Sequence, residues 1–209
     1  MSKEKQKVNV TLAIDSSSSV SGVALFVDKE LKEYTEVVHK VDKKMAQEQI
    51  DINQNHMQLI IDKLLFKYLF ANRETVEIEQ FNLVIEQPNI AYTNNNKTTK
   101  RLYMYVGLWI GKITALLTAM DNMINKTQLH IYDGNTIWRS FKFDKDKSKI
   151  QSVAKVKELY NVDLADYKIP KYNQDGTIKR DRTGQMVYQI GPKHNAADAI
   201  LLGHIFLNK

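Results

Sequence analysis

Three carboxylates in this sequence stand where a metal ion or a phosphate could bind. Asp15 follows the apolar run LAI and precedes four serines, so a phosphate could approach it closely. Glu86 directly follows the apolar run LVI, where a charge is costly unless it is solvated, paired or bound to a cation. Asp198 stands among alanines in the first turns of an expected helix. Because Mg²⁺ prefers several carboxylate oxygens held on rigid elements, the three acids together predict a metal site.

Each acid also has a simpler explanation when it is taken alone. An acid that follows a strand is commonly just the solvated end of that strand, and this covers Asp15 and Glu86. An acid near the start of a helix complements the helix dipole, and this covers Asp198. The prediction of chemistry therefore depends on the combination.

The elements expected to position these acids alternate along the chain. Runs rich in apolar and β-branched residues predict strands. These runs cover residues 8–14, 22–28, 81–85 and 129–132, and the first two form an opening hairpin. Apolar residues at three- and four-residue spacings predict helices. The helices cover residues 40–71, 102–123, 150–160 and 194–207, with a polar loop at 89–100. The expected fold class is α/β, with a mixed sheet whose antiparallel opening strands precede strand-helix units.

Residues 164–190 interrupt this alternation and are interpreted as an inserted β-hairpin, called the arm below. Strand-like runs flank its Asp175-Gly176 turn. Its basic residues are Lys168, Lys171, Lys179, Arg180 and Arg182, interleaved with Tyr167, Tyr172 and Tyr188. Such residues could pair with phosphates and stack on unpaired bases at a branch point. Equally, a tyrosine-rich hairpin could pack on a second copy of the chain.

Two further basic segments are candidates for contact with a nucleic-acid backbone. Lys142, Lys145, Lys147 and Lys149 follow Trp138-Arg139, although Asp144 and Asp146 lie among them and a solvated charge run is the alternative. Residues 94–101 contain Lys97, Lys100 and Arg101 and no apolar side chain. Close to Glu86, that segment would suit phosphate contacts, unless it is an ordinary surface loop.

Composition sets broad limits on the class of protein. The 209 residues suit one domain, residues 1–209, that buries a sizeable core. The absence of cysteine excludes disulfides and thiolate metal sites and favours a reducing, cytoplasmic location. No membrane span is expected, because Gly107, Gly111 and Lys112 interrupt the most apolar stretch. The net charge of +6 favours a polyanionic partner only weakly.

The order of these motifs resembles the RuvC family of Holliday junction resolvases, within the RNase H-like superfamily. TLAIDSSSSVSGVALF resembles the first strand with its aspartate and a return through Gly22. LVIEQP resembles the second-acid motif, and TNNNKTTKRLYMYVGLWIGKITALL the following loop and helix. PKHNAADAILLGHIF resembles the acidic C-terminal helix. The arm and the diverged middle of the chain favour a phage-type member.

The resemblance implies a structure-selective endonuclease that acts on branched DNA in recombination and repair. Two Mg²⁺ ions, which Mn²⁺ could replace, would hydrolyse the phosphodiester, with Asp15 bridging them and Glu86 and Asp198 completing the pair. It also implies that Arg139 and Lys147 approach the cleaved phosphate. The partners would be branched DNA and a second copy of the chain, since a two-fold dimer matches a two-fold junction. Neither a membrane nor a small-molecule substrate is expected.

The sequence departs from the family pattern three residues before Asp198. The family usually has an acid or a histidine there, whereas this chain has Asn195, preceded by His194. Asn195 could be a neutral ligand, His194 could have taken over from one residue earlier, or asparagine could have replaced an original acid. Both can share a helix face with Asp198. Alternatively, Asn195 only caps the helix.

Other functions compete with this interpretation. An actin-like phosphotransferase also opens with a strand, an aspartate and small residues, but it needs a second copy of that motif, and none is visible. A non-enzymatic junction-binding protein of the same fold is compatible with Asn195. A nuclease of this superfamily with another substrate, such as an RNA/DNA hybrid, is a third alternative.

Overall fold

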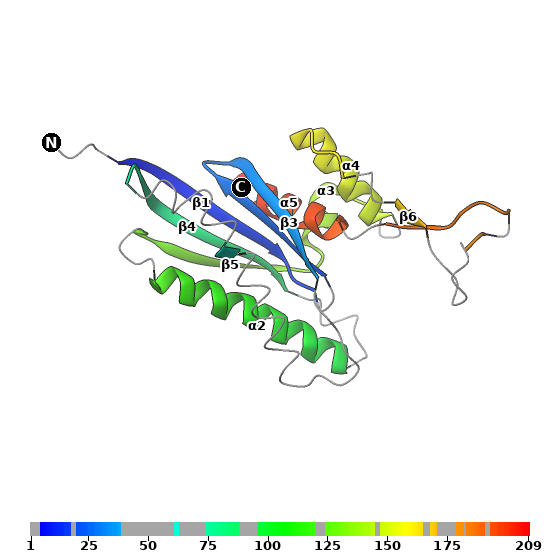
Figure 1. The fold of residues 1–209 in the computed structure, drawn as a ribbon, viewed down its shortest axis with the longest axis horizontal. Coiled ribbons are helices and arrows are strands. Elements are labelled where there is room, and N and C mark those ends of the chain that lie inside the picture. The colour runs from blue at the N-terminus through cyan, green and yellow to red at the C-terminus, as the bar shows by residue number, and fades with distance from the viewer. Residues whose placement is uncertain are drawn as a thin grey trace.

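The centre of the molecule is a five-stranded mixed sheet in the order β3-β2-β1-β4-β5 (Figure 1). The strands are β1 (Gln6–Asp15), β2 (Val20–Val27), β3 (Glu30–Val38), β4 (Val76–Gln87) and β5 (Thr127–Asp133). β1, β2 and β3 pair antiparallel, while β4 pairs parallel with both β1 and β5. This arrangement confirms the expected mixed sheet and its opening hairpin.

The computed structural model describes most, but not all, of the chain. The described residues are 5–17, 20–38, 61–62, 74–87, 96–119, 124–144, 147–164, 168–170, 179–181, 183–190 and 193–209. Most of the helix expected at 40–71 lies outside them. Ile61 and Asp62 are helical, and Ile61 is fully buried.

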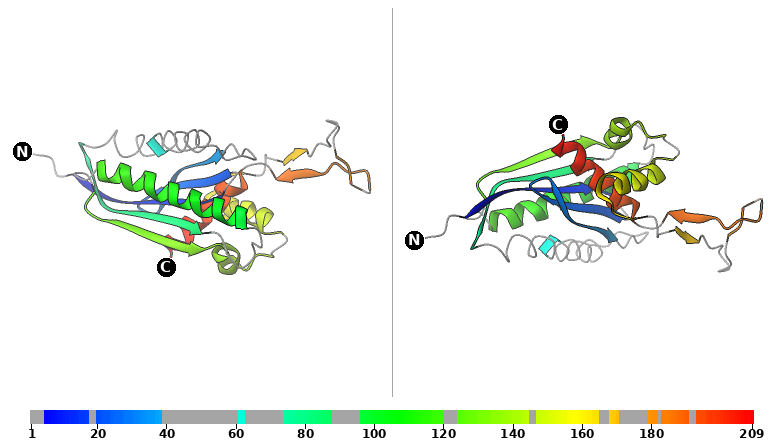
Figure 2. Two further views of the ribbon diagram at one scale, coloured as in Figure 1. Left: turned by 90° about the horizontal axis from the view of Figure 1, so that it is seen from below. Right: turned by 90° about the horizontal axis from the view of Figure 1, so that it is seen from above.

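Helices cover both faces of the sheet (Figures 1 and 2). They are α2 (Asn96–Ala119), α3 (Thr136–Phe141), α4 (Ser148–Tyr160) and α5 (His194–Leu207). α2 lies on one face, where Trp109 and Ile113 pack against Leu12 and Ile85 in one core cluster. The other three helices lie on the opposite face, where a second cluster joins α5 to β1, β2 and β4. Because both faces are covered, the central strands are almost continuously apolar.

α2 contains a window, Leu102–Ala119, that is long and apolar enough to cross a membrane by length and composition alone. Tyr105, Trp109 and Ile113 in this window are buried in the core cluster beneath the sheet. One side of the helix thus packs against the sheet, while only 22% of the window is buried. The expectation of no membrane partner therefore stays a prediction.

Three elements differ from the sequence-based expectation. β3 was not predicted, because residues 30–38 carry many charged side chains and lack a clear apolar run. The short helix α3 was not predicted either. α2 begins at Asn96, so the loop prediction was wrong from that residue on. Lys97, Lys100 and Arg101 therefore lie in the first turns of a helix, where basic residues do not complement the helix dipole.

The arm is paired at its base. β6 (Lys168–Pro170) and β7 (Tyr188–Ile190) form an antiparallel pair, and an isolated bridge joins Arg180 to Met186. Near that bridge, Asp181 Oδ1 accepts the N–H groups of Thr183 and Gln185. The predicted Asp175-Gly176 turn lies outside the described residues. β6 and β7 project from the end of the molecule where β1 and β4 finish and α5 starts (Figures 1 and 2).

Candidate active site

Carboxylates from three strands form one row across the sheet. The strand register pairs Glu36 of β3 with Gly22 of β2, Gly22 with Asp15 of β1, and Asp15 with Glu86 of β4. Residues paired in this way point to the same face of a sheet. Two of these acids, Asp15 and Glu86, were predicted from the sequence. The structure makes them direct neighbours at the ends of parallel strands.

The glycine in this row lets the start of α5 approach the sheet. A Cβ atom on Gly22 would lie 1.8 Å from the carbonyl oxygen of Asn195 and 2.8 Å from the nitrogen of Ala196. Only glycine leaves room for the helix backbone there. The first turn of α5 thus rests directly on β2, which brings Asp198 to the acidic row.

Glu36 binds the exposed N–H groups at this helix end. Its Oε1 atom accepts hydrogen bonds from the backbone nitrogens of Asn195, at 3.0 Å, and Ala196, at 3.1 Å. The residue in the N-cap position, Lys193, makes no capping bond with its side chain. Burial raises the pKa of Glu36 to about 7, against the opposing effect of these hydrogen bonds. The cap of α5 therefore comes from β3 and not from Asn195.

Asp15 and Glu86 share a site that disfavours two negative charges. Burial, and then the charge of Asp198, raises the pKa of Asp15 to about 8. Burial, and then the charges of Asp15 and Asp198, raises the pKa of Glu86 well above its usual value. The two side chains hydrogen bond to each other. The metal-free site therefore retains a proton near neutral pH, as two adjacent carboxyl groups do.

α4 supplies the immediate surroundings of Asp198. Burial raises the pKa of Asp198 to about 6, while a hydrogen bond from Ser152 and the charge of Lys149 act in the opposite direction. Ser152 is buried, and Lys149 precedes it by one helical turn. The charge of Lys149 also lowers the pKa of Asp15. One face of α4 thus orients one acid and offsets the negative charge of two.

The donor set fits a hard divalent cation in its chemistry. Asp15, Glu86 and Asp198 offer carboxylate oxygens from two strands and a helix. Their raised pKa values mark a buried concentration of negative charge that a cation would relieve. Among the described residues, no three His, Asp or Glu side chains converge closely enough to enclose an ion as they stand. Ion binding would therefore require these side chains to adjust.

The serines after Asp15 were expected to leave room for a phosphate. Ser16 is buried, and its hydroxyl has no hydrogen-bond partner within the described chain. The hydroxyl of Ser21 donates to the carbonyl of Ser17 and accepts from Trp109 Nε1 at 3.2 Å. This network ties the start of β2 to α2, and Trp109 is fully buried. The other two serines, at positions 18 and 19, lie outside the described residues.

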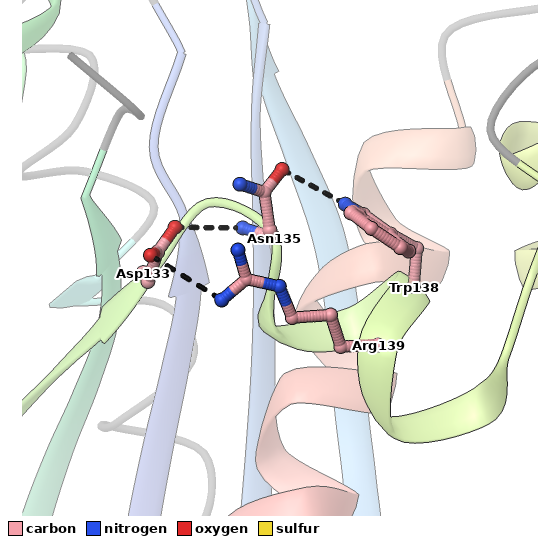
Figure 3. A network of polar contacts seen from close by, with 4 residues as sticks. All are labelled: Asp133, Asn135, Trp138 and Arg139. Atoms are coloured by element: carbon pink, nitrogen blue, oxygen red, sulfur yellow. Dashed lines mark hydrogen bonds and ion pairs between the residues drawn. The ribbon is translucent and has the colours of Figure 1, made fainter. Parts of the chain in front are cut away.

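Arg139 lies in a polar network after β5 (Figure 3). Its Nη1 atom is 3.8 Å from Asp133 Oδ2, and its guanidinium lies over the ring of Trp138. Asp133 also accepts the backbone N–H of Asn135, whose side chain accepts from Trp138 Nε1. The side chain of Arg139 is still 59% exposed, so it remains open to a phosphate.

The other predicted basic residues differ in their exposure and in their effect on the acids. Lys142 ends α3 in a left-handed conformation and is exposed, and Lys147 is exposed at the N-cap of α4. Lys149 is the member of this group whose charge acts on Asp15 and Asp198. In the arm, Lys179 and Arg180 are exposed, and Arg182 lies outside the described residues.

Sequence reasoning missed two residues of this site. Glu36 stands in a charged segment and resembles any solvated glutamate, so no local signal singles it out. Ser152 stands in an ordinary amphipathic helix. The helix position also explains why Lys149, and not Lys147, acts on Asp198. Lys149 lies three residues before Ser152 and shares its helix face, whereas Lys147 does not.

The sheet order and the covering helices define the RNase H-like fold, which confirms the expected fold class. The structure is similar to that of the yeast mitochondrial Holliday junction resolvase, with a TM-score of 0.52 and 10% identity over 98% of this chain and 82% of that chain. It is also similar to Thermus thermophilus RuvC, with a TM-score of 0.47 and 14% identity over 94% and 93% of the two chains. The RuvC complex with a Holliday junction substrate gives the same TM-score at 13% identity. No protein-family model and no curated protein matches the sequence significantly.

Proposed function

We propose that this chain is a metal-dependent endonuclease of the RuvC type that cuts branched DNA such as Holliday junctions and forks. The observation that carries the proposal is the pairing of Asp15 with Glu86 in register, next to the helix that bears Asp198. The fold shared with a yeast junction resolvase supports it. We further propose that the chain is a phage-type member of the family and acts in the bacterial cytoplasm.

The three acids would hold Mg²⁺, with Mn²⁺ as a substitute. When bound, such ions activate water for attack and stabilise the leaving oxygen of the scissile phosphodiester. Asp15 and Glu86 must first release the proton that they share. Ser152 orients Asp198, and Lys149 offsets the negative charge that DNA adds to the site. Asn195, His194 and Lys147 remain candidates for a fourth ligand and a phosphate contact.

Basic residues around the acids would bind the DNA backbone. Arg139 lies on α3, Lys142 follows the last residue of that helix, and the first turns of α2 carry Lys97, Lys100 and Arg101. β6 and β7 project from the end of the molecule where β1 and β4 finish, so the arm could reach DNA bound there (Figure 1). We further propose a homodimer, because cutting two symmetry-related strands requires two active sites related by a two-fold axis.

A cleavage assay on five labelled substrates tests this proposal. The substrates are a four-way junction, a fork, a flap, a linear duplex and an RNA/DNA hybrid, each with Mg²⁺, with Mn²⁺ and with EDTA. We expect metal-dependent nicks in the branched DNAs and little cutting of the linear duplex. Asp15→Asn provides the matched inactive control, since it removes one carboxylate and keeps the shape of the side chain.

The same assay separates the alternatives. Preferential cutting of the hybrid would replace branched DNA with another substrate of the superfamily. Tight, salt-dependent junction binding without cleavage in either metal would identify a non-enzymatic junction-binding protein. In that case, Asn195→Asp would be the first variant to test for a gain of cleavage.

A further inference from the structure

The start of α5 is fixed by a residue far away in the sequence. Helices are usually capped by a side chain at their own N-cap, which stabilises the helix without placing it in the fold. Here Lys193 makes no such bond, and the N–H groups of Asn195 and Ala196 donate to Glu36 of β3. A cap from a sheet strand does more than a local cap, because it also fixes the helix relative to the sheet.

Glu36 lies in the same row as the candidate catalytic acids. Gly22 separates it from Asp15, and the backbone of Asn195 fills the space where a side chain of residue 22 would lie. Asp198 follows Asn195 by three residues and therefore lies on nearly the same helix face. Holding Asn195 in place thus holds Asp198 in place.

The carboxylate of Glu36 is committed to this contact. Its Oε1 atom accepts both backbone N–H groups, and the side chain of Asn195 also hydrogen bonds to this carboxylate. Oε2 is buried without a hydrogen-bond partner of its own in the part of the chain that the structure describes. Burying an unpaired carboxylate oxygen is unfavourable. A serine or aspartate at position 193 would cap the helix without that cost. Stabilising the helix alone would therefore not require a buried Glu36. Fixing the position of α5 on the sheet explains why the chain bears the cost of burying its Oε2 atom.

We propose that Glu36 is a positioning residue of the active site, which sets the location of Asp198 relative to Asp15 and Glu86 by holding the first turn of α5. This inference rests on the proposed function, because it assigns Glu36 to the metal-binding reaction. Glu36 acts through the helix and contacts neither the metal nor the DNA. In this proposal the acceptor oxygen Oε1 holds the helix, while the charge of Glu36 has a separate effect and raises the pKa of Asp15.

Mn²⁺ binding to three variants tests the inference. Glu36→Ala removes the cap, and Glu36→Gln keeps an oxygen that can accept both N–H groups. Tyr160→Phe is the matched control, because it removes the 2.9 Å hydrogen bond to His204 at the other end of α5. The Kd for Mn²⁺ is measured by electron paramagnetic resonance, with junction cleavage and thermal unfolding measured in parallel.

We expect Glu36→Ala to weaken Mn²⁺ binding by about 10- to 100-fold, as is typical when the partner that orients a ligand is removed. Glu36→Gln should restore most of the affinity. Tyr160→Phe should lower the unfolding temperature and leave the Kd unchanged. If the alanine variant does not fold, Glu36→Asp replaces it, since a shorter side chain keeps the charge but cannot reach both N–H groups.

Two results would overturn the inference. Wild-type Mn²⁺ affinity in Glu36→Ala or Glu36→Asp would show that the cap does not position the site. Equal losses in Glu36→Gln and Glu36→Ala would show that the negative charge matters and the acceptor geometry does not. By contrast, a wild-type protein that neither binds Mn²⁺ nor cuts branched DNA would refute the proposed function itself.

Discussion

Replacing Gly22 with alanine tests the packing of α5 on the acidic row. The added Cβ atom would lie 1.8 Å from the carbonyl oxygen of Asn195 and 2.2 Å from its carbonyl carbon. Both atoms belong to the helix backbone, so no side-chain rotation relieves the overlap. Ordinary contacts with a Cβ atom begin near 3.4 Å. The first turn of α5 must therefore withdraw by about 1.6 Å, the difference between these two distances.

This displacement is large for an active site. A misplacement of about 1 Å can lower a catalytic rate about 100-fold, so we expect at least that loss for Gly22→Ala. The hydrogen bonds from Asn195 and Ala196 to Glu36, 3.0 and 3.1 Å long, would also break. Overpacking should lower the free energy of unfolding by about 1 to 3 kcal/mol.

The rate of nicking of a four-way junction, measured in a single turnover with saturating Mn²⁺, gives the effect on chemistry, and urea unfolding gives the effect on stability. Gly203→Ala is the matched control. Gly203 lies on α5 about two turns after Asn195, and a Cβ atom there would lie 2.3 Å from the side chain of Phe26. That variant should lose stability while keeping most of its nicking rate. A Gly22→Ala protein that folds and nicks at the wild-type rate would refute the packing argument.

Four other predictions follow from the site and the arm. Asp15→Asn, Glu86→Gln or Asp198→Asn should abolish nicking but leave junction binding in gel shifts, since most affinity comes from phosphate contacts elsewhere; normal nicking would remove that residue from the site. Without metal, the free energy of unfolding should fall as the pH rises from about 4 to about 8. The reason is that folded Asp15, with a pKa of about 8, keeps a proton that the unfolded chain releases. Denaturant titrations at several pH values measure this, and a flat profile would contradict it. Asn195→Asp should increase Mg²⁺-supported cleavage relative to Mn²⁺-supported cleavage, because it adds a carboxylate oxygen. His194→Ala should lower cleavage if His194 is a ligand. If neither variant changes cleavage, the metal site consists of the three acids alone. Neutralising the five basic residues of the arm should lower the slope of log affinity against log salt by about 0.9 for each phosphate that is no longer neutralised, whereas an unchanged slope with dissociation of the dimer in sedimentation would make the arm an oligomerisation element.

Local sequence predicted most of the strands and helices in the described part of the chain. The runs VNVTLAI, GVALFV and FNLVI are strands in the structure, and α5 has the predicted bounds of residues 194–207. In each case the side chains of a short segment determine its conformation, either through β-branching or through helical periodicity. β3 was missed because its exposed charges hide the pattern of a strand that is buried on one side.

The sequence by itself also determined which acids to consider, since Asp15, Glu86 and Asp198 each follow or begin an apolar element. Only the tertiary structure decided how they meet. β1 and β4 are far apart along the chain, and their register, which places Asp15 beside Glu86, results from sheet pairing that no local pattern encodes. The same holds for Glu36, which lies some 160 residues before the helix that it caps. Local propensities fix what a segment becomes, whereas long-range packing fixes which side chains share a site.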